Sequence, residues 1–185
     1  MKNKKHYPVF LSLPVLLILA SCNNKPSIDK SILFQDGDLP DKITSGNVTD
    51  APEWIVSGIP EAKVQLYEPL EKNGDFVGSI LILLYGSNSE AEEAYSAVLY
   101  KFENDDGGYS ENISNIGEKS AIAEVWDPQG HDFGIYGADI AFIRCNSVIR
   151  IRYDDTYPQD TIIDYLIVYA KNVDTRIISS DMCKQ

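Results

Sequence analysis

Only one histidine of this chain is a candidate for catalysis. The 185 residues include two histidines, and His6 lies in an N-terminal segment with the character of a removable leader, described below. His131 stands in the turn-like stretch Asp127-Pro128-Gln129-Gly130-His131-Asp132. A Ser-His-Asp triad would need it as the base, but no nucleophile-elbow sequence accompanies it. We therefore expect a solvated loop imidazole and no enzyme; a small secreted hydrolase using His131 is the alternative.

Metal sites have weak support in the sequence. One histidine and dispersed cysteines cannot supply the four clustered ligands of a zinc site. Calcium prefers oxygen ligands, but none of the acidic stretches matches the twelve-residue calcium loop. These stretches are Asp36/Asp38/Asp41, Glu103/Asp105/Asp106 and Asp127/Asp132. We expect no metal and no cofactor.

Three of the four arginines, Arg144, Arg150 and Arg152, fall within nine residues. Clustered guanidinium groups could bind a carboxylate or phosphate in bidentate fashion. The alternative is a set of ordinary ion pairs on an outer sheet face, each worth about 0–1 kcal/mol. Candidate partners for such pairs are Glu124, Asp139, Asp154 and Asp155.

Composition and charge limit the partners. The chain is 44% apolar and 10% aromatic, which is typical of a globular domain. The net charge of −12 argues against a nucleic-acid partner, because phosphate neutralisation dominates that affinity. Eleven tyrosines and two tryptophans could form a carbohydrate or peptide platform. We expect most of them to pack instead, as Tyr95, Tyr165 and Tyr169 fall at helix positions.

The N-terminus carries the strongest motif. Residues 1–7 contain three lysines and no acid, and the apolar stretch from Val9 to Ala20 is too short to span a bilayer. The following Leu19-Ala20-Ser21-Cys22 resembles the lipobox of bacterial lipoproteins. The resemblance implies cleavage after residue 21 and diacylglycerol on Cys22. The chain would then be held by lipid at the outer side of a cell membrane or outer membrane, with a net charge of −15.

The remaining boundaries follow from this leader. We expect residues 1–21 to be the signal peptide, 22–31 the lipidated cysteine and a polar tether, and 32–185 one α+β domain. If Cys22 is acylated, Cys145 and Cys183 remain as an even pair in an oxidising compartment, where a disulfide is favoured. Two free thiols are the alternative.

Hydrophobic periodicity predicts the elements. An Asn-Gly pair at 73–74 between apolar runs indicates a hairpin, and Ser87 with Glu90, or Ser89 with Glu92, could cap a helix. The expected strands are 63–68, 76–85, 119–126 and the two arms of a hairpin over 139–153; the expected helices end near 102 and 178. The order β-β-α-β-β-β-α predicts an α+β fold, with a mostly antiparallel sheet of five to six strands and two packed helices.

The second hairpin can be checked for register. A two-residue turn at 145–146 or at 146–147 leaves the same residues on one face, namely Ile140, Phe142, Ile149, Ile151 and Tyr153. That face should be the core face. The opposite face carries Ala141, Ile143, Arg150 and Arg152.

The mature chain resembles small extracytoplasmic α+β domains of bacterial lipoproteins and sensor ectodomains, loosely PsbP-like. The stretches that carry the resemblance are Asp38-Leu39-Pro40, Ile116-Gly117-Glu118-Lys119 and 142–149. It implies a non-catalytic binding, sensing or assembly module of unknown ligand, with membrane lipid and an unidentified protein or small molecule as partners. A purely structural envelope component is a further alternative.

Overall fold

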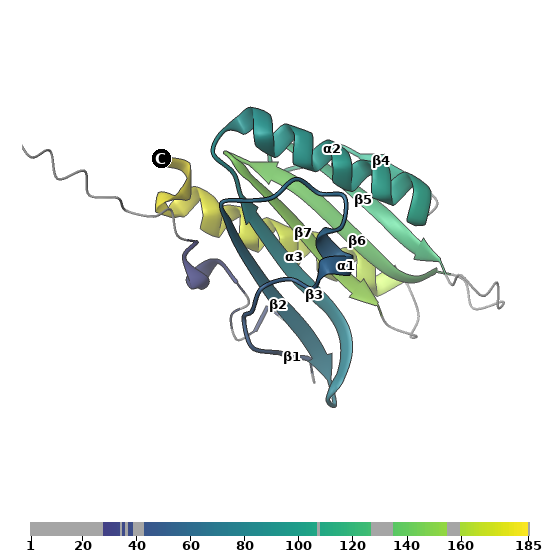
Figure 1. The fold of residues 1–185 in the computed structure, drawn as a ribbon. Coiled ribbons are helices and arrows are strands. Elements are labelled where there is room, and N and C mark those ends of the chain that lie inside the picture. The colour runs from purple at the N-terminus through teal and green to yellow at the C-terminus, as the bar shows by residue number, and fades with distance from the viewer. Residues whose placement is uncertain are drawn as a thin grey trace, which may run out of the picture.

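A seven-stranded antiparallel sheet organises the chain. The computed structural model describes residues 28–33, 35, 37–38, 43–106, 108–126, 135–154 and 160–184 (Figure 1). Within these residues the strand order is β1-β2-β3-β7-β6-β5-β4, and each neighbouring pair is antiparallel. The strands are β1 Ile43–Ser45, β2 Val64–Lys72, β3 Asp75–Leu84, β4 Tyr109–Glu111, β5 Lys119–Trp126, β6 Ile135–Arg144 and β7 Ser147–Asp154.

Three α-helices cover this sheet: α1 Glu53–Val56, α2 Asn88–Asp105 and α3 Asp160–Ser179. Two 3-10 helices, η1 Lys30–Ile32 and η2 Asp181–Lys184, lie near the chain ends. The expected α+β class with a mainly antiparallel sheet is confirmed. The expected numbers of strands and helices were too low, and the order lacked β1, α1 and β4. These elements have only three or four residues each, too few to produce a periodic pattern.

Two tight turns fix the hairpins. Asn73 and Gly74 both have positive φ, 56° and 89°, as a two-residue hairpin turn requires. In the second hairpin Arg144 pairs with Ser147, so Cys145 and Asn146 form the turn, and Cys145 has a φ of 56°. The structure thereby chooses between the two turns that the sequence allowed.

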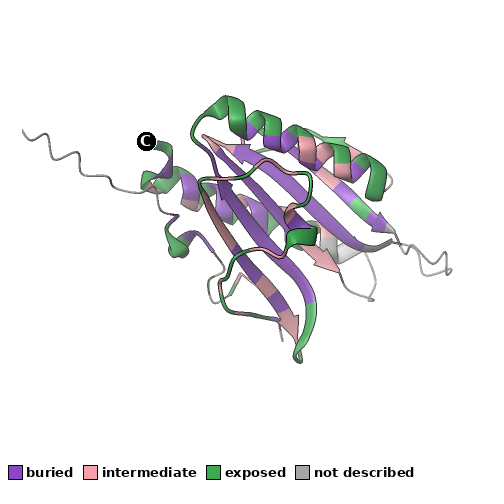
Figure 2. Cartoon of the chain, viewed as in Figure 1, coloured by how far each residue is buried: buried purple, intermediate pink, exposed green. Residues whose placement is uncertain are grey.

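The sheet is buried on both faces (Figure 2). On one face α3 packs on aliphatic side chains of the central strands, where Ile140, Phe142, Ile149 and Ile151 are all fully buried as expected. On the other face α2 and α1 pack on Leu81, Leu83, Ala141, Ile143 and Val148. Figure 1 shows α1 and α2 in front of the sheet and α3 behind it. We refer to the α3 face and the α2 face below.

Helix α2 begins at a predicted cap. The Ser87 hydroxyl accepts the backbone N–H of Glu90, and the Glu90 carboxylate accepts the backbone N–H of Gly86 at 2.7 Å. The capping pair is therefore Ser87 and Glu90. The predicted stripe docks the helix through Ala91, Ala94, Tyr95, Val98 and Phe102, all buried.

The folded body starts earlier than expected. Ile28 is 7% exposed and belongs with Ile32 and Leu33 to the core under α3. The Asp29 side chain caps η1 by accepting the backbone N–H of Ser31 at 2.9 Å. Residues 28–31 were assigned to the tether, but Ile28 and η1 belong to the domain, because the side chains of Ile28 and Ile32 are buried in the core beside α3. No helix in the described part of the chain is long and apolar enough to span a bilayer.

Candidate functional site: the α1–α2 surface and the ion cluster beneath it

A buried ion pair lies at the centre of the α2 face. Arg150 of β7 is opposite Ala141 of β6, and Asp139 lies two residues away on the same face of the sheet. The Arg150 Nε donates to both Asp139 carboxylate oxygens at 3.1 and 2.9 Å, and its Nη2 donates to Oδ2 at 2.5 Å. Arg150 is 8% exposed and Asp139 is fully buried. The two side chains are therefore bonded to each other in the interior of the domain.

Phe102 of α2 covers this pair. The Arg150 Cζ lies 5.6 Å from the centre of the Phe102 ring, within cation–π distance. Burial disfavours the charge of Arg150, but the adjacent Asp139 carboxylate outweighs burial and raises the guanidinium pKa. Arg150 thus stays charged inside the domain.

Arg152 extends the pair into a cluster. Its Nε donates to both carboxylate oxygens of Asp154 at 3.0 and 2.9 Å. Its Nη1 lies 4.0 Å from carboxylate oxygens of Asp106 and of Asp139. The ion cluster, defined as Asp106, Asp139, Arg150, Arg152 and Asp154, holds three carboxyl groups and two guanidinium groups. It has one more potential negative charge than positive charge.

The excess of carboxyl groups affects the pKa of Asp106. It follows the last residue of α2 and is 7% exposed. Burial, with the neighbouring Asp139 carboxylate, raises its pKa to about 6, although Arg152 and Arg150 act in the opposite direction. The C-terminal end of a helix is also an unfavourable place for an anion. We therefore expect Asp106 to bind a proton near neutral pH; burial also raises the pKa of Asp154 in the same cluster.

The structure does not bring the three predicted arginines into one anion site. Arg144 points to the α3 face, where its Nε and Nη2 each donate to Asp174 of α3 at 2.7 Å. Asp174 also accepts the backbone N–H of Gly117 at 3.1 Å. Arg150 and Arg152 lie on the α2 face. The expectation that these two occupy a solvated outer face was wrong, because α1 and α2 cover that face.

Two depressions adjoin α1 and the residues that follow it. A small hollow over the ion cluster has a volume of about 10 Å³, roughly the space for one water molecule. Its walls are Trp54, Ile55, Ser79, Leu81, Arg150 and Arg152. A larger open groove of about 390 Å³ lies between the end of α1 and α2. Its walls are Ser57, Gly58, Ala97, Tyr100, Lys101 and Asp105.

Lys101 joins the two sides of the groove. Its Nζ donates to the Ser57 carbonyl oxygen at 3.2 Å and lies 3.9 Å from an Asp105 carboxylate oxygen. The Lys101 side chain is 22% exposed, whereas that of Asp105 is 64% exposed. Gly58 leaves open space in the groove, since no atom lies within 4 Å of a Cβ placed on this glycine.

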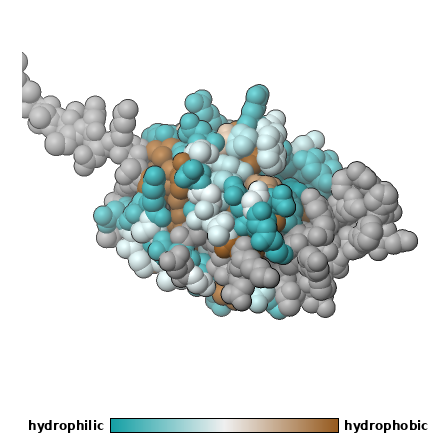
Figure 3. All heavy atoms as spheres, turned by 90° about the horizontal axis from the view of Figure 1, so that it is seen from below, coloured by the Kyte–Doolittle hydropathy of each residue, from teal (hydrophilic) through white to brown (hydrophobic). Residues whose placement is uncertain are grey.

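Two large aromatic side chains remain exposed beside these depressions. Trp54 is 62% exposed on α1 and Tyr100 is 69% exposed on α2. Tyr95 and Tyr169 are buried as expected, but Tyr165 on α3 is 56% exposed. We call Trp54, Ser57, Gly58, Tyr100, Lys101 and Asp105 the α1–α2 surface. Seen from below, the molecule shows a mainly hydrophilic surface with small separate hydrophobic patches (Figure 3).

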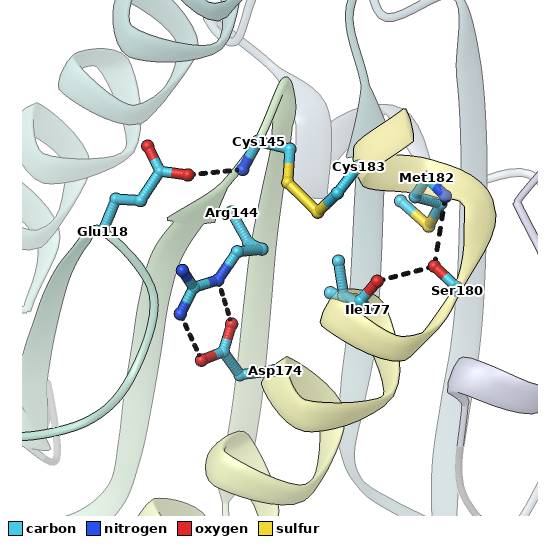
Figure 4. Close-up of a disulfide and its surroundings, with 8 residues drawn as sticks. All are labelled: Glu118, Arg144, Cys145, Asp174, Ile177, Ser180, Met182 and Cys183. Carbon is cyan, nitrogen blue, oxygen red and sulfur yellow. Dashed lines mark hydrogen bonds and ion pairs between the residues drawn. A yellow bond between two sulfur atoms is a disulfide. The ribbon is translucent and has the colours of Figure 1, made fainter. Parts of the chain in front are cut away.

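The cysteines meet at another end of the fold. Cys145 in the β6–β7 turn and Cys183 in η2 form a disulfide, with their Cα atoms 5.4 Å apart (Figure 4). Glu118 accepts the backbone N–H of Cys145 at 2.8 Å, and Met182 is buried next to Cys183. The Arg144–Asp174 pair lies close by (Figure 4). Together these contacts hold the C-terminal segment against the sheet.

Other predicted site residues lie elsewhere. Cys22, His131, Asp36, Asp41, Asp127, Asp132 and Asp155 lie outside the described residues. Asp38 pairs with Arg176 at 2.7 Å. Among the described residues no three His, Cys, Asp or Glu side chains form a group that could hold a metal ion.

The groove residues were missed by sequence reasoning. Tyr100 and Lys101 appear as ordinary polar-face residues of an amphipathic helix. Ser57 and Gly58 appear as loop residues. Trp54 stands in the one apolar cluster of an otherwise polar stretch, but nothing in the sequence places that cluster beside α2.

Comparisons with known proteins give a fold and no family. No family model matches the chain, and no curated protein matches it. The fold is similar to the crystal structure of the extracellular domain of PknH from Mycobacterium tuberculosis, with a TM-score of 0.52 and 8% identity. The match covers 82% of this chain and 95% of that domain. At this identity the likeness is one of fold alone.

Proposed function

We propose that the chain is a lipid-anchored, extracytoplasmic binding module without catalytic activity, and that the α1–α2 surface is its recognition surface. The observation that carries the binding role is the groove of about 390 Å³ between α1 and α2, bordered by the exposed ring of Tyr100. Exposed aromatic side chains combine apolar area with a polar tip, as recognition sites use them. The extracellular origin of the structural neighbour agrees with this location.

The groove favours binding over catalysis. Its charged side chains are Lys101 and Asp105, which lie 3.9 Å from each other, and Lys101 also donates to Ser57. The carboxyl group with a pKa near 6, Asp106, is buried near Arg152 and does not line the groove. The hydrolase alternative depends on His131, and loss of turnover in His131→Ala would support it.

The anchor proposal predicts a short connection to the bilayer. It rests on the lipobox-like sequence and on the early start of the fold at Ile28. Only residues 23–27 separate Cys22 from Ile28, so a flexible connection would span about 5–6 Å × √5, or roughly 12 Å. The body is acidic and would be repelled by anionic lipid. The acyl chains would therefore have to provide the attachment.

The anchor is tested by comparing the full chain with Cys22→Ser. We expect the full chain to fractionate with membranes and to show a mass that lacks residues 1–21 and includes the lipid. The variant should stay unprocessed and unlipidated. A native product that keeps residues 1–21, or that lacks lipid on Cys22, would contradict the anchor without affecting the binding role.

The recognition surface is tested by thermal-shift screening against a small-molecule and peptide library. A ligand at 100 times its dissociation constant should add about 2.7 kcal/mol to stability. We expect any such shift to be lost in the Trp54→Ala/Tyr100→Ala double variant. Tyr165→Ala removes another exposed ring, on α3, and serves as the control. A shift retained in the double variant but lost in the control would place recognition elsewhere.

A further inference from the structure

The groove of the α1–α2 surface offers a hydrogen-bond donor beside an acceptor. An ammonium group has three N–H donors. Among the described residues Lys101 uses one of them in a hydrogen bond, to the Ser57 carbonyl, while Asp105 lies 3.9 Å away. Donors of Lys101 and acceptor sites on the 64% exposed Asp105 thus remain for a ligand, side by side. A hydroxyl group both donates and accepts, so adjacent hydroxyl groups match this pair.

The charge of the groove points to a neutral ligand. Lys101 and Asp105 carry one charge of each sign, so the groove itself has no formal net charge. The chain has a net charge of −12, which makes the surrounding surface unfavourable for anions. A cation would meet the ammonium group of Lys101 in the wall of the groove. Neither strong anions nor strong cations fit this combination.

The apolar component of the groove is a flat ring. Tyr100 is 69% exposed on α2, and its neighbour along the groove, Ala97, is small. Trp54 presents a second exposed ring on α1 and lines the small hollow over the ion cluster. A ligand with a flat C–H face and hydroxyl groups at its edge would cover such a ring and reach Lys101 and Asp105. Sugar rings have both properties.

We propose that the groove binds a neutral saccharide, with one sugar ring stacked on Tyr100 and its hydroxyl groups hydrogen-bonded to Lys101 and Asp105. The volume of about 390 Å³ falls within the usual range of small-ligand sites. This inference rests on the proposed binding role of the α1–α2 surface and adds the chemical class of its ligand.

The test uses the full chain in a detergent without a sugar headgroup. The probes are maltotriose, N,N′,N″-triacetylchitotriose and the peptide trialanine, each titrated by calorimetry. We expect at least one of the two saccharides to bind. Tyr100→Ala should weaken that binding by about tenfold, because the stacking surface is lost. Tyr165→Ala should leave it unchanged.

A second pair of variants tests the groove without removing the Tyr100 ring: one variant fills the groove and the other is its control. Ala97→Gln places a larger side chain in the groove. Ser96→Gln makes the same kind of change at the preceding residue of α2, which is exposed and is not among the groove residues. We expect Ala97→Gln to abolish saccharide binding and Ser96→Gln to preserve it. Circular dichroism and the melting temperature establish that each variant is folded.

The outcomes separate the two proposals. If trialanine binds in a Tyr100-dependent manner and neither saccharide binds, the saccharide inference is overturned while the recognition surface stands. If a saccharide binds equally well to Tyr100→Ala and Ala97→Gln, the placement in the groove is wrong. Absence of binding to both saccharides at millimolar concentration by the folded wild-type chain also overturns the inference.

Discussion

The two faces of the sheet carry different kinds of side chain. The α3 face carries bulky aliphatic and aromatic side chains that fit against one another with no exposed area, including Ile82, Ile140, Phe142 and Ile149. The α2 face carries alanines from β5 and β6 and a cluster of five ionisable groups, of which Asp106, Asp139 and Arg150 are buried. It also adjoins two depressions and two exposed aromatic rings. We infer that both faces stabilise the fold, the α3 face mainly through tight apolar packing, and that the recognition surface proposed above lies only over the α2 face.

The largest effect is expected in the core of the α3 face. Phe142→Ala removes a fully buried ring from β6 and should lower the free energy of unfolding by about 4 kcal/mol, through lost burial and a new cavity. Phe142→Leu, which keeps most of the volume, should cost only about 1 kcal/mol. Urea denaturation of both variants measures the difference. A cost below about 1 kcal/mol for the alanine variant would contradict the stabilising role of this face.

The ion cluster gives the corresponding test on the α2 face. Asp139→Ala leaves Arg150 buried without its partner and should cost about 3 kcal/mol. The double variant Asp139→Leu/Arg150→Met replaces both charges by apolar side chains and should recover stability to within about 1 kcal/mol of wild type. The same denaturation experiment measures both. A double variant as unstable as the single one would show that the pair itself, and not the unpaired charge, determines the cost.

The ion cluster also shows which features of the fold could not be predicted from the sequence. Alternation along β6 and β7 correctly placed Ile140, Phe142, Ile149 and Ile151 on one face and Arg150 and Arg152 on the other. It could not show that α2 covers the second face, because a strand that alternates apolar and cationic residues has the same pattern when its cationic side is solvated. The partner Asp139 was among the candidates, but its burial depends on packing between elements distant in the sequence.

The other predictions about the fold were right where the signal is local in the sequence, and elements or contacts that depend on tertiary packing were not predicted. Asn73-Gly74 and the Ser87–Glu90 pair predicted a turn and a helix start, because each depends on backbone geometry within a few residues. Strands β1 and β4 are three residues long and owe their existence to the strands beside them. The groove depends on Ser57 lying next to Lys101, a contact between residues 44 positions apart. No local pattern encodes such a contact.

The disulfide reinforces the C-terminal end of α3. Cys145→Ala/Cys183→Ala should lower the free energy of unfolding by about 3 kcal/mol, since the bond closes a long loop and restricts the unfolded chain. The intact mass should rise by about 2 Da on reduction, the two hydrogens that the thiols regain. An unchanged mass would show free thiols. Reduction of the wild type should reproduce the lower stability of the double variant.

Asp106 makes the stability of the α2 face depend on pH. Its pKa of about 6 in the fold lies above the ordinary value of 3.8. The native state therefore binds this proton more tightly, and stability falls as pH rises from 4 to 7. Asp106→Asn should raise the free energy of unfolding by about 2 kcal/mol at pH 8 and change it little at pH 4.

Thermal melts of this variant across pH give the measurement. Asp105→Asn, which alters the adjacent and exposed carboxylate, is the matched control; because Asp105 is the smallest of the causes that raise the Asp106 pKa, it should shift the pH profile only slightly. An Asp106→Asn profile that still follows the wild type between pH 4 and 7 would assign the titration to another group.

The smallest effect on stability is expected at the ring that we place in recognition. Helix α1 docks through Ile55, which is 5% exposed, while Trp54 is 62% exposed. Ile55→Ala should cost about 2 kcal/mol, whereas Trp54→Ala should stay within about 0.5 kcal/mol of wild type. Paired melting curves check this contrast. Equal costs would mean that the indole is needed to hold α1 on the sheet, and the case for an exposed ring kept for a ligand would fail. A small cost agrees with the place of Trp54 on the proposed recognition surface, because the ring is then free to contact a ligand without loss of stability.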